Sequence, residues 1–321
     1  MPIHRLDGSV SPLMTASPPT ALLMPSPRRP ALHEACVTSG LAAIDVDDPE
    51  QAAAALHGTS VRFACVPVSD VERFTRGQLG ALPLLKTLDH PCTDADLADA
   101  LTATGGSHAI CVGPDPIAPE QRTLLRRLGG QTPSLAESVG TDALEHTIEV
   151  RSNKERYAAL DVLTDVLSAE HVQRRWIWDV QTVADELLSN AIFHAPVSPT
   201  GERLHAHRHR QEEVQLGDAQ KVVLSFVCSS TRVALRCTDV FGSVDTAALI
   251  RRFTYGLRHG AEPLEGVSAG IGLLLVAWKA CHLALDVHPG KSTSVTAVLD
   301  VGARRDRRRP RSVTIQEEVG R

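Results

Sequence analysis

The chain has 321 residues, a length that corresponds to about two domains of ordinary size. Its 43% hydrophobic and 22% charged residues are typical of a soluble globular protein, and its net charge of −5 excludes a general attraction to nucleic acid or anionic membranes. No apolar run approaches the roughly 18 residues of a membrane span, and the first residues lack the apolar core of a secretory signal. Seven scattered cysteines without a Cys-x-x-Cys pair favour free thiols in a reducing compartment. We therefore expect a cytoplasmic protein.

The first part of the chain predicts alternating strands and helices. Residues 1–19 are rich in Pro, Ser and Thr, and we expect them to be disordered. The short apolar runs that follow are 20–25, 40–46, 61–68, 81–88 and 107–113. The helical patterns between and after them are 29–39, 49–58, 71–80, 93–106 and 119–130. Several of these patterns open with Pro, Asp or Thr and an acidic first turn, as helices do. Residues 20–130 are therefore predicted to form a doubly wound parallel α/β domain.

This layout resembles the receiver domain of two-component response regulators, and the resemblance is one of topology alone. A receiver needs acidic residues at the end of its first strand to hold Mg²⁺, an Asp at the end of its third strand and a Lys after its fifth. Here those positions read Pro25-Ser26, Pro67-Val68-Ser69 and Gly113-Pro114. Without a carboxylate cluster there is no site for a hard cation and no phosphoacceptor. We interpret 20–130 as a degenerate receiver-like interaction domain, with an unrelated α/β domain of similar topology as the alternative.

The second part of the chain predicts a different architecture. Residues 131–145 carry polar and turn signals and are predicted to be a linker. The elements predicted after it are a strand from 146, helices over 154–172 and 174–195, a polar loop over 198–220, strands over 221–230 and 231–240, a further polar loop, a helix within 266–282, and a hairpin over 283–300. Helices combined with an antiparallel sheet predict an α+β sandwich over 146–301. Residues 302–321 form a basic tail, with six arginines within 304–311, that is predicted to be solvated.

The helix predicted over 174–195 carries an unusual polar stripe. Glu186, Asn190 and His194 follow one another at steps of four, which places their side chains on one face. A neighbouring core-facing stripe consists of Ile177, Val180, Ala184, Leu187 and Ala191. A carboxylate and an amide oxygen one turn apart can hold Mg²⁺ and position a water. Taken alone, the stripe is better explained as a solvated helix face.

Two later features bear on that choice. The strand over 231–240 carries Asp239 near its end, before a Gly-containing turn, where a carboxylate can accept a hydrogen bond from the exocyclic amine of a purine. Gly266, Gly270 and Gly272 directly precede a helix. Glycines at that place let backbone N–H groups approach phosphates at the helix N-terminus. The order is therefore an acid-plus-Asn helix, a strand-end Asp, a glycine-rich helix start and a Thr-bearing strand.

That order resembles the GHKL ATP-binding superfamily, which includes histidine kinase catalytic domains, gyrase, MutL-type repair proteins and the anti-sigma-factor serine kinases. In the anti-sigma branch the N box reads Glu-x-x-x-Asn-Ala-x-x-His, and the segment from Glu186 to His194 reads ELLSNAIFH. The family's Glu acts as general base or orients the attacking group, and its Asn binds Mg²⁺. The resemblance, which covers 146–301, thus implies a catalytic Glu186, a metal site at Glu186 and Asn190, and ATP and Mg²⁺ as cofactors.

The resemblance also implies the remaining nucleotide contacts. It assigns adenine binding to Asp239 and the second glycine box to Gly270, Ile271, Gly272 and Leu273. It puts Gly266 at the edge of the ATP lid, and Thr293, in the strand that follows "GKS", beside the Asp239–adenine network. His194 completes the N box among the cofactor-binding residues.

One part of the family pattern is altered. The usual first glycine box is Asp-x-Gly-x-Gly, whereas this chain has Phe241 in place of the first glycine and Ser243 in place of the second. Gly242 is expected to supply the turn in a shifted register. A Phe beside adenine either stacks on it or narrows the pocket.

Two functions follow from these residues. One is a serine/threonine protein kinase or ATPase of the anti-sigma type, which binds ATP·Mg²⁺ and acts on a regulatory protein partner. The other is a catalytically inactive nucleotide-binding switch or interaction module that works through partner binding. A sensor histidine kinase fits less well, because no long helix with a phosphoacceptor His precedes residue 146. A homodimer is a further expectation, as relatives often pair through this fold, whereas no membrane or nucleic-acid partner is expected.

The polar loop offers a third hypothesis. His205, His207 and His209 alternate along the chain and could together bind a transition metal. A solvated loop beside the nucleotide domain is the alternative that the sequence favours.

Overall fold

The computed structural model describes residues 18–57, 60–75, 82–89, 91–113, 116–140, 142–198, 200–209, 212–260, 271–302 and 311–317. Its first half alternates strands and helices as predicted. The elements are β1 (Thr20–Leu23), α1 (Arg29–Thr38), β2 (Ala42–Asp45), α2 (Pro49–Leu56), β3 (Val61–Pro67), α3 (Val71–Thr75), β4 (Leu84–Asp89), α4 (Asp94–Thr102), β5 (Ser107–Val112) and α5 (Pro119–Leu128). The helix starts follow local chemistry: Asp48 caps α2, and Thr93 forms a capping box with Asp96 at α4.

The five strands of this half are all parallel, and they lie in the order β2-β1-β3-β4-β5. That order is one of the two common doubly wound arrangements, so the predicted α/β class is confirmed for this part of the chain.

The second half contains helices and antiparallel strands. Its elements are α6 (Leu135–Val139), β6 (His146–Val150), α7 (Asn153–Ala169), α8 (Arg174–Ser189), a π-helical turn (Asn190–His194), β7 (Val222–Cys228), β8 (Arg232–Asp239), α9 (Thr246–His259), α10 (Ile271–Lys279), β9 (His282–His288), β10 (Ser292–Asp300) and β11 (Ser312–Glu317). The predicted hairpin is the β9–β10 pair, and the predicted amphipathic helices are α7 and α8.

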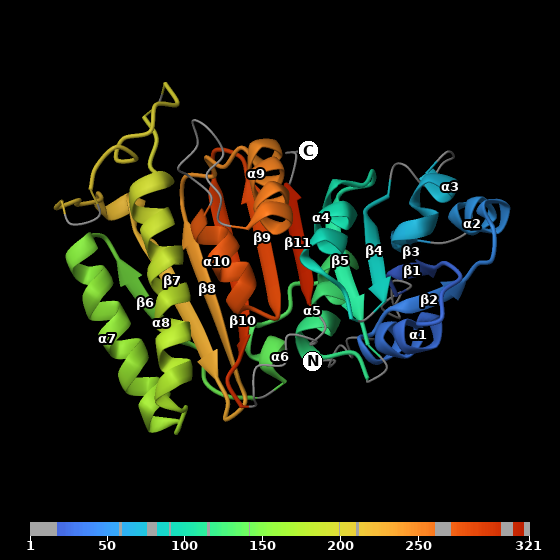
Figure 1. Cartoon of the computed structure of the whole chain (residues 1–321), viewed down its shortest axis with the longest axis horizontal. Helices are drawn as coiled ribbons and strands as arrows, with labels where there is room; N and C mark the ends of the chain where they lie inside the picture. Colours follow the sequence, from blue (N-terminus) through green and yellow to red (C-terminus); the bar gives the residue numbers. More distant parts are fainter. Residues whose placement is uncertain are drawn as a thin grey trace, which may run out of the picture.

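The two halves share one mixed sheet of eleven strands (Figure 1). Its order is β2-β1-β3-β4-β5-β11-β9-β10-β8-β7-β6. The strand that joins the halves is β11, which pairs antiparallel with β5 and parallel with β9. The boundaries predicted from sequence therefore separate two parts of a continuous sheet.

Three segments differ from their predicted structure. Residues 312–317, predicted as part of a solvated tail, form the central strand β11 because β5 and β9 supply backbone partners on both sides. The predicted polar loop after β8 contains α9, and the predicted linker contains α6, whose start is capped by Ser134. The predicted disordered segment 1–19 lies outside the described residues, except for 18 and 19.

Helices cover both faces of the sheet (Figure 1). One large core joins α7, α8, α9 and α10 to the second half of the sheet, and it also includes residues of α4 and β5 from the first half. On the opposite face, Leu135 and Val139 of α6 pack against Ala234, Cys281 and Val298. Among the described helices, none combines the length and the apolarity of a membrane span.

Candidate functional site

The predicted polar stripe lies at the end of α8. The core-facing residues of α8 are buried as predicted: Ile177, Val180, Ala184, Leu187 and, just beyond, Ala191. Glu186, Asn190 and His194 are half-buried, at the border between the core and the surface. They are therefore neither a fully solvated face nor part of the core.

The helix changes its winding at the predicted Asn. From Asn190 the chain makes one π-helical turn, closed by a hydrogen bond of 2.9 Å from the Ala195 N–H to the Asn190 carbonyl. Single π turns are frequent at functional sites, where they re-aim side chains. The end of this turn is fixed by two neighbours: the side chain of Arg203 donates to the His194 carbonyl, and Ser243 Oγ donates to the Ala195 carbonyl at 2.6 Å. The Ser243 bond ties the N box to the segment that follows Asp239.

Asp239 ends β8 as a buried carboxylate, with 5% of its surface exposed. Its Oδ1 accepts hydrogen bonds from the backbone N–H groups of Phe241, at 2.8 Å, and Gly242, at 3.4 Å. Burial raises the pKa of Asp239, and the two amide donors oppose that rise because they stabilise the charged form. The carboxylate is thus held in a fixed orientation by the turn that follows it.

Thr293 of β10 is paired with Asp239 in the antiparallel register of β10 and β8. Thr293 is buried, with 2% of its surface exposed, and its backbone and hydroxyl both act on the Asp239 carboxylate, whose pKa they lower. Asp239 and Thr293 together therefore offer an acceptor and a hydroxyl for a bound group.

Gly242 supplies the turn after Asp239, as the shifted register predicted. Its φ is +55°, and a β-carbon there would lie 2.1 Å from the carbonyl oxygen of His288. The Gly290 N–H donates to the Gly242 carbonyl at 3.1 Å, so the turn is docked on the β9–β10 hairpin. Phe241 beside it is buried, with 9% of its surface exposed.

Glu186 lies against the start of α10. A β-carbon at Gly272 would come within 1.6 Å of Glu186 Oε1 and 2.7 Å of its Cγ, so a side chain at this position would require the flexible Glu186 carboxylate to move. Glu186 and Gly272, 86 positions apart in the chain, are therefore in direct contact. Ile271 is the first residue of α10, and Leu273 is buried in the main core. Gly266 and Gly270 lie outside the described residues.

These contacts bring most of the predicted residues to one region, the end of α8. Helix α10 packs on α8, β8 packs on the π turn, and Ser243 binds the Ala195 carbonyl. Within the described residues, no three or more His, Cys, Asp or Glu side chains converge as metal ligands. His205, His207 and His209 therefore do not form such a cluster in the described part of the chain. A Mg²⁺ ion bound through only one or two side chains plus phosphate and water is a different kind of site, which that finding does not address.

One buried charge near the N box was missed from the sequence. Arg156 of α7 is 2% exposed, and it donates to Ser189 and lies 3.4 Å from Asp185 Oδ1. Both partners belong to the segment of α8 that carries Glu186 and leads into Asn190. The sequence did indicate that Arg156 is buried, because it stands three residues before Ala159 and seven before Leu163, on the core-facing side of the helix.

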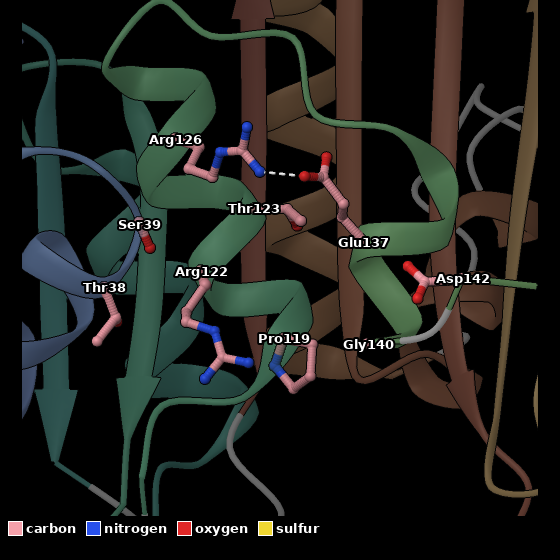
Figure 2. A pocket seen from close by; sticks show the side chains of 9 residues that line it. All are labelled: Thr38, Ser39, Pro119, Arg122, Thr123, Arg126, Glu137, Gly140 and Asp142. Atoms are coloured by element: carbon pink, nitrogen blue, oxygen red, sulfur yellow. Dashed lines mark hydrogen bonds and ion pairs between the residues drawn. The ribbon is translucent and has the colours of Figure 1, made fainter.

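A pocket of about 410 Å³ lies elsewhere, over the outer face of α5 (Figure 2). Its lining residues are Thr38, Ser39, Pro119, Arg122, Thr123, Arg126, Glu137, Gly140 and Asp142. Figure 2 shows the ion pair of Arg126 and Glu137 across the gap between α5 and α6. The pocket's charges are balanced, and it shares no residue with the predicted nucleotide contacts.

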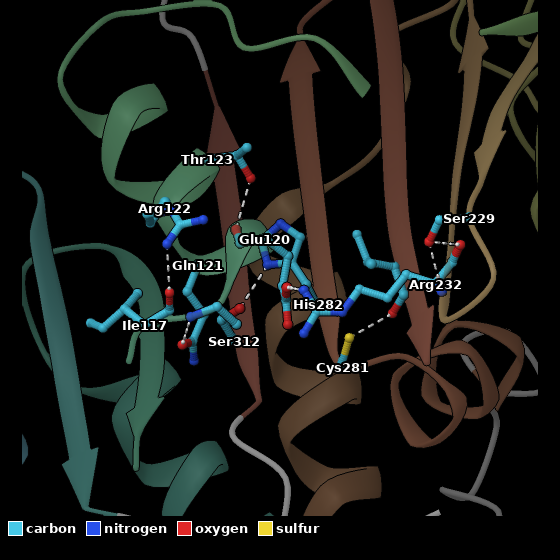
Figure 3. Close-up of polar contacts among 12 residues, drawn as sticks. Ile117, Glu120, Gln121, Arg122, Thr123, Ser229, Arg232, Cys281, His282 and Ser312 are labelled. Atoms are coloured by element: carbon cyan, nitrogen blue, oxygen red, sulfur yellow. Dashed lines mark hydrogen bonds and ion pairs between the residues drawn. The ribbon is translucent and has the colours of Figure 1, made fainter. Parts of the chain in front are cut away.

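Buried polar contacts connect the two halves beneath α5 (Figure 3). Glu120 of α5, which is 2% exposed, forms an ion pair with Arg232 of β8. His282 Nδ1 shares a hydrogen bond of 2.7 Å with Ser312 Oγ, and His108 Nδ1 shares one with Thr314 Oγ1. Both flanking strands thus hold β11 through a buried histidine. Burial, together with nearby Arg127, lowers the pKa of His282 to about 3.

Comparison with known proteins adds little to these observations. No family model and no curated protein sequence match the chain. Among solved structures, the chain is similar to one in the SiaB–SiaC complex from Pseudomonas aeruginosa, at 17% identity and a TM-score of 0.31. That similarity covers 47% of this chain and 88% of the other. A TM-score of this size carries no argument, so the assignment of function rests on the residues described above.

Proposed function

We propose that the second half of the chain is a GHKL-type ATP-binding unit and that the protein is a signalling regulator that acts on a protein partner. The observation that carries this proposal is the pairing of Asp239 with Thr293. A buried carboxylate held by backbone donors, next to a buried hydroxyl, fits the exocyclic amine and ring edge of adenine. The family pattern expects an Asp and a Thr in these two roles.

The residues near α8 fit the phosphate end of the same ligand. Gly272 has no side chain, so a phosphate could approach its backbone at the start of α10 once the Glu186 carboxylate moves aside. Asn190 offers an amide oxygen and Glu186 a carboxylate, which are ligand types that Mg²⁺ accepts. Mg²⁺, when bound, neutralises the charge of the β- and γ-phosphates. The protein's own task would be to hold the nucleotide by Asp239 and to orient the attacking group by Glu186.

Two observations favour the second function, a nucleotide-binding switch without turnover. Phe241 is a buried aromatic residue at the place of a glycine that the family uses near the nucleotide. The Glu186 carboxylate lies against Gly272, at the helix end where phosphate would bind. A kinase needs that carboxylate near the attacking group instead, so turnover requires Glu186 to move.

Thermal unfolding and product analysis distinguish these functions. We expect ATP·Mg²⁺ and ADP·Mg²⁺ to raise the Tm of the wild type, because a ligand that binds only the folded state stabilises it. A kinase or ATPase would in addition release ADP or label a partner protein, and Glu186→Ala would abolish this while keeping the Tm shift. A Tm shift without any turnover would show that the protein is a nucleotide-binding switch and not a kinase or ATPase. If neither nucleotide shifts the Tm, the proposed function is wrong.

A further inference from the structure

Helix α9 lies between the two halves of the molecule. It follows Asp239 by a short turn, starts at Thr246 with Asp245 as its cap, and ends at His259. In Figure 1 it stands next to α4 on one side and α10 on the other. Its chain position is between the two predicted nucleotide-binding motifs, and its neighbours belong to different halves.

The contact of α9 with the first half is both apolar and charged. Phe253 and Leu257 of α9 are buried in the same core as Leu97 and Leu101 of α4. At the rim of this contact, Arg258 Nη2 donates to Asp99 Oδ1 at 2.6 Å. The apolar part holds the two helices together, and the ion pair, whose side chains are 39% and 62% exposed, adds a weaker contact at the rim.

The contact of α9 with the second half leads to the candidate site. Gly256 of α9 is packed so closely on α10 that a β-carbon there would lie 2.6 Å from Leu274 Cδ2. Leu274 is two residues after Gly272, the residue that touches Glu186. A shift of α9 therefore moves the start of α10 relative to Glu186, because close-packed elements transmit displacement instead of absorbing it.

We propose that the receiver-like half regulates the nucleotide site through the α4–α9 contact. The chain of contacts runs from Asp99 to Arg258, from Gly256 to Leu274, and from Gly272 to Glu186. Held against α4, α9 keeps α10 in place and the start of α10 preorganised for a phosphate group. A ligand or partner protein that displaces α4 weakens nucleotide binding. This inference rests on the proposed function, since it names the regulation of the same site.

A charge-swap experiment on the full chain tests the proposal. Asp99→Arg opposes Arg258 with a like charge, and Arg258→Asp combined with it restores an ion pair of inverted polarity. We expect Asp99→Arg to raise the Kd of ADP at least threefold in calorimetric titration, and the swapped double variant to return within twofold of the wild type. Asp47→Arg is the matched control, because Asp47 pairs with Arg29 in the same half at a distance from α9.

Hydrogen–deuterium exchange provides a readout that needs no nucleotide. In Asp99→Arg we expect faster exchange in α9 and in the amides of 273–279, with recovery in the swapped variant and no change in Asp47→Arg. Unchanged exchange in α10 would overturn the inference whatever the nucleotide does. If the wild type binds no nucleotide but the variants show the expected exchange pattern, the proposed function is wrong and the mechanical coupling between α4 and α10 still holds. An ADP Kd unchanged or lowered by Asp99→Arg would contradict the coupling itself.

Discussion

The carboxylate of Glu186 lies against the backbone of Gly272, so that a β-carbon added at Gly272 would overlap the Glu186 side chain. Glu186 reaches Gly272 from the last turns of α8, and Gly272 stands in the first turn of α10. This contact joins two motifs that the sequence showed only as separate patterns, and it defines one edge of the candidate site.

The first prediction concerns this contact. Gly272→Ala should forfeit part or all of the about 1 kcal/mol that Ala gains over Gly within a helix, because the Glu186 side chain must move away from the new methyl group. In a Glu186→Ala background the same change should be stabilising, since Ala is favoured over Gly within a helix by about 1 kcal/mol. Urea unfolding of the four proteins measures this coupling. Equal effects in both backgrounds would show that the two residues are not in contact.

The turn after Asp239 gives a second prediction. Gly242→Ala should cost about 3 kcal/mol or more, because φ is +55° and the new β-carbon would meet the backbone oxygen of His288, which cannot rotate away. Gly290→Ala is the matched control: its φ is +67°, but no atom lies within 4 Å of the added carbon. The control should cost only the left-handed penalty of about 1–2 kcal/mol. Similar Tm losses for both variants would contradict the docking of this turn on the hairpin.

The buried histidines predict an acid-sensitive fold. The pKa of His282 is lowered to about 3 and that of His108 to about 4, by burial and by neighbouring cations. In the unfolded chain a histidine has a pKa of about 6.5, so the unfolded state binds more protons below that pH. Stability is therefore full above about pH 6.5 and falls as the pH drops toward 4, by about 2 kcal/mol per histidine between pH 7 and pH 5.

Unfolding in urea at pH 7 and pH 5 measures this dependence. In His282→Gln the loss between the two pH values should be smaller than in the wild type by about 2 kcal/mol, since one of the two groups is removed. His207→Gln, at an exposed histidine of the polar loop, is the control and should keep the wild-type difference. A wild type equally stable at both pH values would refute the predicted linkage.

Removing only the cation of the Glu120–Arg232 ion pair should destabilise the protein more than removing both charges. Arg232→Met should destabilise the protein by about 3–5 kcal/mol, because it leaves the carboxylate of Glu120, 3% exposed, without its cation. Adding Glu120→Gln should recover a large part of this loss, as it removes the uncompensated charge. Chemical unfolding of the single and double variants provides the comparison. A double variant less stable than Arg232→Met would speak against this account.

Local chemistry made much of the fold predictable. The five strand–helix repeats of the first half follow from apolar runs separated by capped helix starts, such as Asp48 and Thr93. The core-facing stripe of α8 follows from three–four spacing, and the β9–β10 hairpin from alternating residues around a Pro-Gly turn. In each case the signal lies within one short segment.

The elements that could not be predicted depend on distant parts of the chain. Strand β11 follows a run of arginines, and its strand character comes from β5 and β9 on either side. Helix α9 carries arginines and an internal Gly256, and it is stabilised by packing against α4 and α10. The contact of Glu186 with Gly272 could not be predicted either, because the sequence around each residue gives no sign that the other lies next to it.

Isothermal titration with ADP in the presence of Mg²⁺, on wild type, Asp239→Asn and the control Asp218→Asn, tests the central claim most directly. Asp218 is a surface acid whose side chain is 97% exposed. The account predicts that wild type and Asp218→Asn bind ADP with the same Kd. Asp239→Asn should bind at least tenfold more weakly, because its amide oxygen stays with the Phe241 and Gly242 donors and its NH2 group faces the adenine amine, donor against donor. A wild type that binds neither ADP nor ATP, or an Asp239→Asn variant that binds as tightly as wild type, would contradict it.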